Sequence, residues 1–239
     1  SFEGSIPSEI KLLSSISEKI ITNKNTTLIL GLLRTDENKI FNSLVFLNSK
    51  GDIIHNYDKI KLVPFGEYIP FRQYLGDFTD IFAPKDFTSG KLKSNPTING
   101  FENIITLICY EILFTNEIVS RLSKKTNLLI NITNDAWFGK TIGPYQHLAL
   151  AKIKAVEFGL PLARVANTGI SAYVSPYGEI IGKIALDNKG VKTFNLVSPL
   201  DQTLYRIYGD YIFIVLILIL LGINTLYIFN FKEEMLNEK

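Results

Sequence analysis

The first part of the chain alternates between a helical pattern and short apolar runs. In residues 8–22 apolar side chains recur every three or four positions, which predicts an amphipathic helix capped by Ser8. Runs of apolar, β-branched and aromatic residues predict strands at 27–33 and 42–48, and Gly51 marks a turn into a further strand. We therefore expect a helix followed by hairpin-connected strands.

The middle of the chain returns to buried strands after a long irregular stretch. Residues 58–101 are rich in proline and glycine, which predicts ordered loops with little regular structure. Apolar runs at 104–110 and 127–133 predict two buried strands. Between them we expect a short helix that Asn116 caps.

A longer helix and a group of short strands follow. Pro144 opens the helix and Gly159 closes it. Its apolar face is expected to hold Tyr145, Leu148, Ala151, Ala155 and Phe158. Strands are predicted at 162–167, 171–175, 179–184 and 192–197. Helices and strands in this order predict a mixed α/β domain with a buried sheet core, built in layers.

The segment from Tyr211 to Phe229 breaks the globular pattern. It runs 19 residues without a charge and has aromatic residues at both ends. A helix needs about 20 apolar residues to cross the hydrocarbon core, and a buried helix of a soluble protein is shorter and shows a polar face. We therefore expect a membrane-spanning helix near the C-terminus. The predicted regions are a catalytic domain (1–200), a juxtamembrane linker (201–210), the membrane helix (211–230) and a cytoplasmic tail (231–239).

Composition is that of a globular protein. Of the 239 residues 46% are apolar and 20% are charged, which excludes a disordered chain. The net charge is only +2 and basic residues are scattered, so we expect no nucleic-acid partner.

Cys109 is the only cysteine of the chain, and it ends a predicted buried strand. Lone cysteines are usually small core residues, but a strand end also suits a nucleophile. The two histidines, His55 and His147, lack the context of a cysteine–histidine pair, and His147 is expected to order its helix. One cysteine and two scattered histidines also lack the ligand spacing of a metal site.

A carboxylate can take the proton of a thiol, and a lysine can stabilise the charge that then develops. The chain offers Glu3 in "FEGSIP", Lys59 and Glu67 in "YDKIKLVPFGEYIP", and Glu111 in "ICYEILF". Each is weak alone, because surface lysines and glutamates are common. Their order and their local contexts together indicate a catalytic set.

These stretches resemble the nitrilase (carbon–nitrogen hydrolase) superfamily, and more narrowly the apolipoprotein N-acyltransferases. The stretch "NITNDAWFGKTIGPYQHLALAKIKAVEFGLPLARVANTGISAYVSPYGEIIGK" and "TLYRIYGD" extend the likeness almost from end to end. The "KxxLVPFGEYIP" and "NDAWFGxxxGPxQH" blocks are specific to the acyltransferase branch. The resemblance implies a nitrilase-like αββα sandwich, incomplete at its N-terminal side and followed by one transmembrane helix.

The resemblance also implies roles for individual residues. Glu3 matches the general base, Lys59 the lysine that stabilises the tetrahedral intermediate, and Cys109 the nucleophile. Accessory residues near the site are Glu67, Tyr110, Glu111 and Trp137. For some of these a structural role stays open, because Glu67 could pin its proline-rich loop and Trp137 could be a core residue.

The implied reaction is acyl transfer through a thioester on Cys109. A phospholipid is the expected acyl donor, the α-amino group of a diacylglyceryl lipoprotein is the acceptor, and no metal or organic cofactor is expected. The expected location is the bacterial inner membrane, with the catalytic domain in the periplasm. The alternatives are a membrane-anchored amidase that uses water as acceptor, and an inactive fragment of a split or degenerate gene.

The beginning of the chain departs from the family pattern. Glu3 is the third residue, Phe2 stands where the family usually has proline, and no membrane helices precede the domain. We therefore expect a C-terminal piece of a longer protein, whose N-terminal transmembrane portion is a possible partner.

Overall fold

The computed structural model describes residues 23, 25–75, 85–92, 94–98 and 101–237. The helix expected at 8–22 and the candidate base Glu3 lie outside the described residues. Statements about structure below concern the described part of the chain.

Three antiparallel strands form the first sheet, in the order β1-β2-β3. They are β1 (Leu28–Asp36), β2 (Lys39–Leu47) and β3 (Ile53–Asp58). Gly51 lies between β2 and β3 with a φ of 82°, a left-handed value that glycine adopts without strain. The three strands predicted in this region are confirmed.

Five strands form the second sheet, in the order β4-β5-β6-β7-β8. They are β4 (Ile105–Ile108), β5 (Leu129–Asn134), β6 (Leu162–Asn167), β7 (Ser171–Val174) and β8 (Ile180–Ile184). The pairs β4–β5 and β5–β6 are parallel, whereas β6–β7 and β7–β8 are antiparallel. All four residues of β4 are buried, as expected for a parallel strand covered on both faces.

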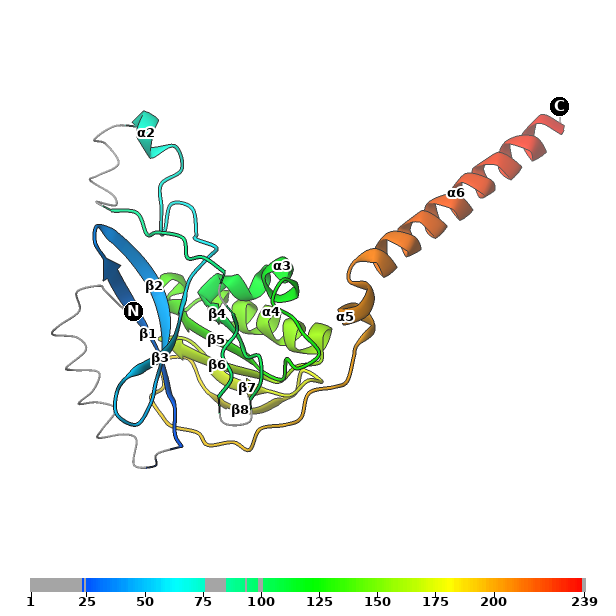
Figure 1. Ribbon diagram of the computed structural model, residues 1–239. Coiled ribbons are helices and arrows are strands. Elements are labelled where there is room, and N and C mark those ends of the chain that lie inside the picture. The colour runs from blue at the N-terminus through cyan, green and yellow to red at the C-terminus, as the bar shows by residue number, and fades with distance from the viewer. Residues whose placement is uncertain (1–22, 24, 76–84, 93, 99–100, 238–239) are drawn as a thin grey trace.

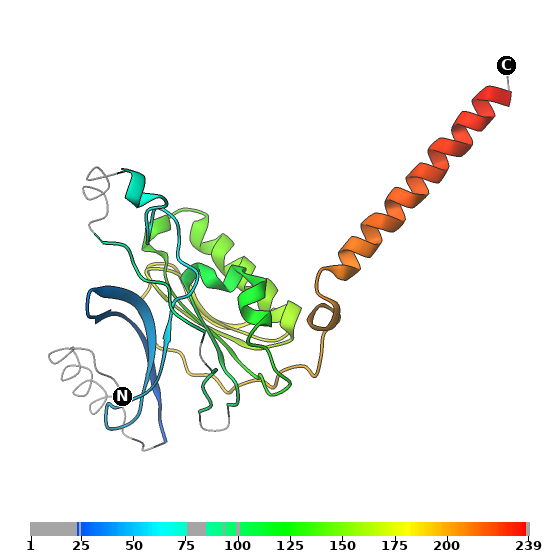
Figure 2. The same cartoon turned by 45° about the horizontal axis from the view of Figure 1, so that its top comes forward.

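The two sheets pack face to face, and helices cover the outer face of the second sheet (Figures 1 and 2). Between the sheets, Leu44 and Phe46 of β2 pack with Ile108 and Ile130. The approach is close at Gly31, where an added Cβ would lie 2.7 Å from Cδ1 of Ile132. The opposite face of β4 and β5 packs on the long helix α4 through Leu148, Ala151, Ala155 and Phe158.

The helices are short except for two. They are α2 (Arg72–Leu75), the 3₁₀ helix η2 (Cys109–Leu113), α3 (Thr115–Val119), the 3₁₀ helix η3 (Asp135–Phe138), α4 (Gly143–Phe158), α5 (Leu204–Tyr208) and α6 (Tyr211–Asn237). As predicted, Pro144 lies in the first turn of α4, and Gly159 ends it with a φ of 62°.

Three local expectations are wrong. Residues 192–197 form no strand; Phe194 instead stacks on Tyr173. Asn116 lies inside α3, whose N-cap is Phe114. Tyr145 does not belong to the buried face of α4, because 55% of its surface is exposed.

Helix α6 extends away from the domain (Figures 1 and 2). Its segment Tyr211–Phe229 has a mean hydropathy of 2.8, and none of it is buried against the rest of the chain. By length and composition α6 could cross a membrane. The preceding segment, expected as a linker, contains α5.

Candidate active site

Cys109 stands at a sharp turn where β4 ends. Its φ is 54°, in the left-handed region that residues with a side chain rarely adopt, and it is the first residue of η2. Such a conformation costs about 1–3 kcal/mol and persists only where the surroundings enforce it. The thiol is partly buried and unbridged.

Glu111 is fully buried two residues after the cysteine. Its Oε1 accepts hydrogen bonds from the amides of Ile60 (2.7 Å) and Lys61 (3.0 Å). Its Oε2 accepts one from the amide of Ile108 at 2.8 Å. The hydroxyl of Tyr57 donates to the same carboxylate at 3.0 Å.

These bonds join two segments that are distant in sequence. Glu111 ties the backbone that follows Lys59 to the backbone that precedes Cys109. Burial raises the pKa of Glu111, although the amide hydrogen bonds act in the opposite direction. Burial and the neighbouring Glu111 raise the pKa of Tyr57, so its hydroxyl stays protonated and donates. Glu111 therefore acts as a clamp between the lysine and cysteine segments.

Lys59 follows β3 directly and is 1% exposed. Its Nζ lies 2.6 Å from Oε2 of Glu67. Glu67 also accepts hydrogen bonds from the amide of Val63 at 2.8 Å and from Nδ2 of Asn42 at 3.2 Å. Glu67 thus pins its proline-rich loop and also holds the lysine, while its accessory role in catalysis stays a prediction. A buried ammonium with a fixed partner is suited to stabilising a negative charge that develops nearby.

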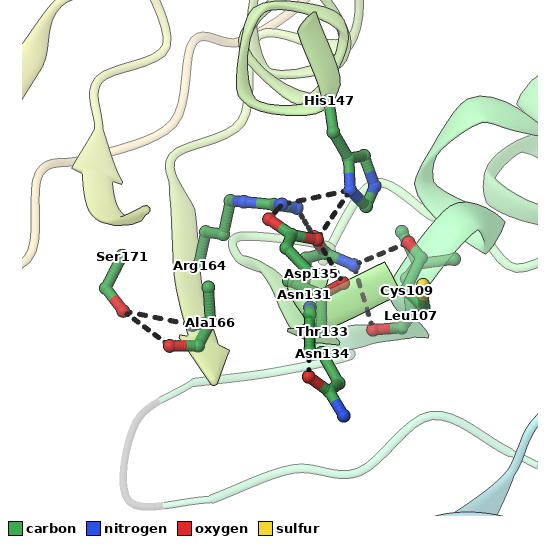
Figure 3. Close-up of polar contacts among 11 residues, drawn as sticks. Leu107, Cys109, Asn131, Thr133, Asn134, Asp135, His147, Arg164, Ala166 and Ser171 are labelled. Carbon is green, nitrogen blue, oxygen red and sulfur yellow. Dashed lines mark hydrogen bonds and ion pairs between the residues drawn. The ribbon is translucent and has the colours of Figure 1, made fainter. Parts of the chain in front are cut away.

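A second polar cluster lies beside the cysteine turn, on β5, η3, β6 and α4 (Figure 3). The Nη1 of Arg164 donates to Oδ1 of Asn131, and its Nη2 lies 2.9 Å from Oδ2 of Asp135. Nδ2 of Asn131 donates to the carbonyl oxygens of Leu107 (3.2 Å) and Cys109 (3.1 Å). The sequence interpretation missed Asn131, Asp135 and Arg164.

One signal could have found Asn131. It stands between Ile130 and Ile132 in a strand expected to be covered on both faces. A buried polar side chain in such a strand needs a hydrogen-bond partner, which predicts a polar cluster on that face.

His147 belongs to the same cluster. Its Nδ1 lies 3.0 Å from Oδ1 of Asp135 and 3.1 Å from Nη2 of Arg164. Burial raises the pKa of Asp135, but the contacts with His147 and Arg164 outweigh it and lower the pKa below its usual value. Burial lowers the pKa of Arg164, opposed by Asp135 and by Cys109.

The aromatic candidates occupy two different environments. The ring of Tyr110 lies 5.3 Å from that of His147, and both line a hollow of about 330 Å³ with Phe138 and Leu150. Trp137 is 78% exposed on η3, so the alternative that it is a core residue is wrong. The described residues contain no group of ligating side chains suited to a metal ion.

Residues 14–200 match the sequence model of the family described as carbon–nitrogen hydrolase. The chain belongs to the carbon–nitrogen hydrolase family. A solved amidase of the nitrilase superfamily from Nesterenkonia shares 18% identity, with a TM-score of 0.53 over 74% of this chain and 63% of that one. A CN-hydrolase superfamily protein from Xanthomonas campestris shares 15% identity, with a TM-score of 0.57 over 78% and 67%. These structures confirm a nitrilase-like α/β fold.

Two relatives of higher sequence identity carry the same name. Apolipoprotein N-acyltransferase of Brucella suis is 42% identical over 168 residues, which are 69% of this chain and 31% of that protein. The protein of that name from Rhodopseudomonas palustris is 35% identical over 212 residues, 84% of this chain and 39% of that protein. The chain thus spans about a third of the length of these relatives.

Proposed function

We propose that this chain is the catalytic part of an apolipoprotein N-acyltransferase. The observation that carries the proposal is the 42% identity over 168 residues with a relative of that name. The candidate membrane helix α6 supports it, because both expected substrates are held in a bilayer and tethering confines the search to two dimensions.

In the first proposed step the thiolate of Cys109 attacks the ester carbonyl of a phospholipid acyl chain. A carbon–sulfur bond forms, the carbon–oxygen bond breaks, and the lysophospholipid leaves with a proton. Glu3 is the proposed proton carrier, and Lys59 is the proposed donor to the tetrahedral oxyanion. The fixed Lys59–Glu67 pair and the Glu111 clamp support this assignment, because they hold the ammonium and the cysteine turn on one connected scaffold.

In the second step the α-amino group of a diacylglyceryl cysteine attacks the thioester. The nitrogen–carbon bond forms, the carbon–sulfur bond breaks, and the amine proton passes to the carboxylate. The products are an N-acylated lipoprotein and free Cys109 thiolate. The exposed Trp137 and the neighbouring Ile142 are proposed to contact the lipid, since large apolar side chains at a membrane surface gain from leaving water.

The proposed location is the bacterial inner membrane. Residues 211–230 span the bilayer, the catalytic domain lies in the periplasm, and the tail after residue 230 is cytoplasmic. A further N-terminal membrane portion is the proposed partner of this domain, and the greater length of the relatives leaves room for it.

The test uses the full chain in detergent or liposomes with a phospholipid labelled in its acyl chain and a diacylglyceryl peptide. We expect label in the N-acyl peptide and a labelled thioester on Cys109 by mass spectrometry. Cys109→Ser is expected to abolish both signals while circular dichroism stays unchanged. Free fatty acid without N-acyl peptide would assign water as the acceptor, and a folded protein with an accessible thiol but no adduct would contradict the proposal.

A further inference from the structure

A buried cation lies behind the cysteine turn and takes no part in the steps proposed above. The side chains of Arg164 and of its ion-pair partner Asp135 are both 0% exposed. Removing a charge from water costs several kcal/mol, and a paired buried charge is often no more stabilising than an apolar replacement. Stability alone is therefore a weak reason for a guanidinium at this position.

Arg164 is connected to the backbone of Cys109 through one side chain, that of Asn131. Asn131 stands opposite Leu107 in the parallel β4–β5 pair and opposite Arg164 in the β5–β6 pair. Its carboxamide accepts from the guanidinium on one side and donates to the carbonyl oxygens of Leu107 and Cys109 on the other (Figure 3). A hydrogen bond from a charged donor strengthens the next bond in a chain of such bonds.

The guanidinium itself is held on its far side. Asp135 accepts from Nη2 of Arg164 at 2.9 Å, and its other oxygen accepts from the hydroxyl of Thr133 at 2.9 Å. Nδ1 of His147 lies 3.0 Å from that second oxygen, so α4 closes the cluster from above β5. Arg164 therefore has little freedom to move away from Asn131.

We propose that Arg164 is a positioning residue for the Cys109 nucleophile and acts through Asn131, whose carboxamide it holds against the Cys109 backbone carbonyl. The left-handed backbone of Cys109 is strained, and a fixed carbonyl prevents its relaxation to an ordinary turn. The guanidinium also interacts electrostatically with Cys109, and a positive charge beside a thiol favours its ionised form. The inference shares with the proposed function only the assignment of Cys109 as nucleophile.

Other ionisable groups surround this turn and also act electrostatically on the Cys109 thiol. Those on the neighbouring elements are Lys59 and Glu67 after β3, Tyr110 and Glu111 on η2, Asp135 on η3, and His147 on α4. A substitution at Arg164 does not change these side chains. Its effect on the thiol can therefore be compared with the parent protein while the other neighbours stay the same.

The experiment measures alkylation of Cys109 by iodoacetamide from pH 6 to pH 10. Because Cys109 is the only cysteine, intact mass reports its modification without ambiguity. We expect Arg164→Gln to move the midpoint of the rate profile about one pH unit upward, which slows alkylation near pH 7 about tenfold. Arg164→Lys keeps the charge but cannot hold Asn131 and Asp135 together, so a smaller shift is expected. The assay contains no lipid, so its outcome is independent of the acyl-transfer test.

Asn131→Leu is the second variant. It keeps the Arg164–Asp135 pair and removes only the side chain that connects Arg164 to the Cys109 carbonyl, so it tests the proposal even if Arg164→Gln fails to fold. We expect its midpoint to rise as well. The matched control is Lys154→Gln on α4, which removes a different buried cation whose bonds go to Thr115 and Glu157. The unfolding free energy of this control should fall, while the midpoint of its alkylation profile should equal that of the parent protein. A folded Arg164→Gln or Asn131→Leu protein with the parent midpoint overturns the proposal.

Discussion

At the scale of single residues, the candidate site is assembled from charges removed from water. Lys59, Glu111, Asp135 and Arg164 are all buried, and each has a partner at hydrogen-bond distance. In a low-dielectric interior such interactions are strong, and the loss of one partner leaves the other without compensation. Single substitutions here should therefore change reactivity and stability together, and well-chosen pairs of variants can separate the two.

The left-handed backbone of Cys109 gives the first prediction. Cys109→Ala removes the sulfur, and Cys109→Gly removes the Cβ as well. Glycine adopts a φ of 54° without strain, so the glycine variant should be more stable than the alanine variant by about 1 kcal/mol. Urea unfolding of the two proteins measures the difference. An alanine variant equal to or more stable than the glycine variant would show that the turn is unstrained.

Asp135 gives a prediction about acid. Burial raises the pKa of Asp135, but the contacts with His147 and Arg164 lower it by more. The pKa in the folded state therefore lies below that in the unfolded state. The stability that this carboxylate contributes is thus present above the unfolded pKa and is lost as the pH falls through the folded pKa. Asp135→Asn should lower the unfolding free energy by about 3–5 kcal/mol at pH 7.

The difference in unfolding free energy between the Asp135→Asn variant and the parent protein should narrow as the pH falls below about 4. Unfolding curves at pH 7, 5, 4 and 3 test this. The matched control is Asp201→Asn at an exposed carboxylate, which should change little at any pH. A gap that stays constant down to pH 3 would contradict the assignment.

At the scale of elements, the site lies where strands end and irregular segments begin. Cys109 follows β4, Asp135 follows β5, and Lys59 follows β3. Because β4, β5 and β6 are parallel, the residues after them meet at one edge of the sheet. The loop that brings Lys59 to this edge is held by backbone contacts, including a bond from the amide of Gly90 to the Lys59 carbonyl at 2.8 Å.

Gly90 gives a prediction about this loop. A Cβ at this position would lie 2.2 Å from the carbonyl oxygen of Asp58, so the backbone beside Lys59 must move. We expect Gly90→Ala to lower the unfolding free energy by about 1–3 kcal/mol and to reduce thioester formation on Cys109. Gly66→Ala is the control, because its Cβ would make only ordinary contacts with Val63. Equal behaviour of the two alanine variants would argue against this packing.

At the scale of the whole molecule, a layered domain is joined to a long apolar helix that contacts none of its core. The described part of the domain has two sheets and a helical layer, and α6 leaves it after the short helix α5 (Figure 1). An unburied helix with a mean hydropathy of 2.8 exposes a large apolar surface to water, which is unfavourable unless another phase covers it.

The proposed membrane span gives the last prediction. Leu218→Arg together with Leu220→Arg places two charges near the middle of the apolar segment, each costing about 2.5–3.5 kcal/mol on insertion. Most of the double variant should leave the membrane fraction on carbonate extraction. The matched alanine pair at the same positions should remain in the pellet. Retention of the arginine variant would contradict a transmembrane α6.

Much of the fold follows from periodicity. Apolar, β-branched and aromatic runs located β1 to β8 to within a few residues, and Pro144 and Gly159 located the ends of α4. The failure at 192–197 has a physical cause. Only Phe194 of its apolar residues is partly buried, by stacking on Tyr173, and the amide of Val197 donates to the Tyr173 hydroxyl in place of a strand partner, while Leu196 and Val197 stay exposed. An apolar run favours a strand, but it does not say whether a partner strand lies within reach.

Local chemistry by itself determined the strand that leads to Cys109, the long apolar helix and, through its sequence blocks, the family. These depend on side chains close together along the chain. Only the tertiary structure decided that Glu111 clamps the backbone beside Lys59, and that Arg164 reaches the Cys109 carbonyl through Asn131. Such contacts join residues tens of positions apart, and only the pairing and stacking of strands fix which of the many polar side chains meet.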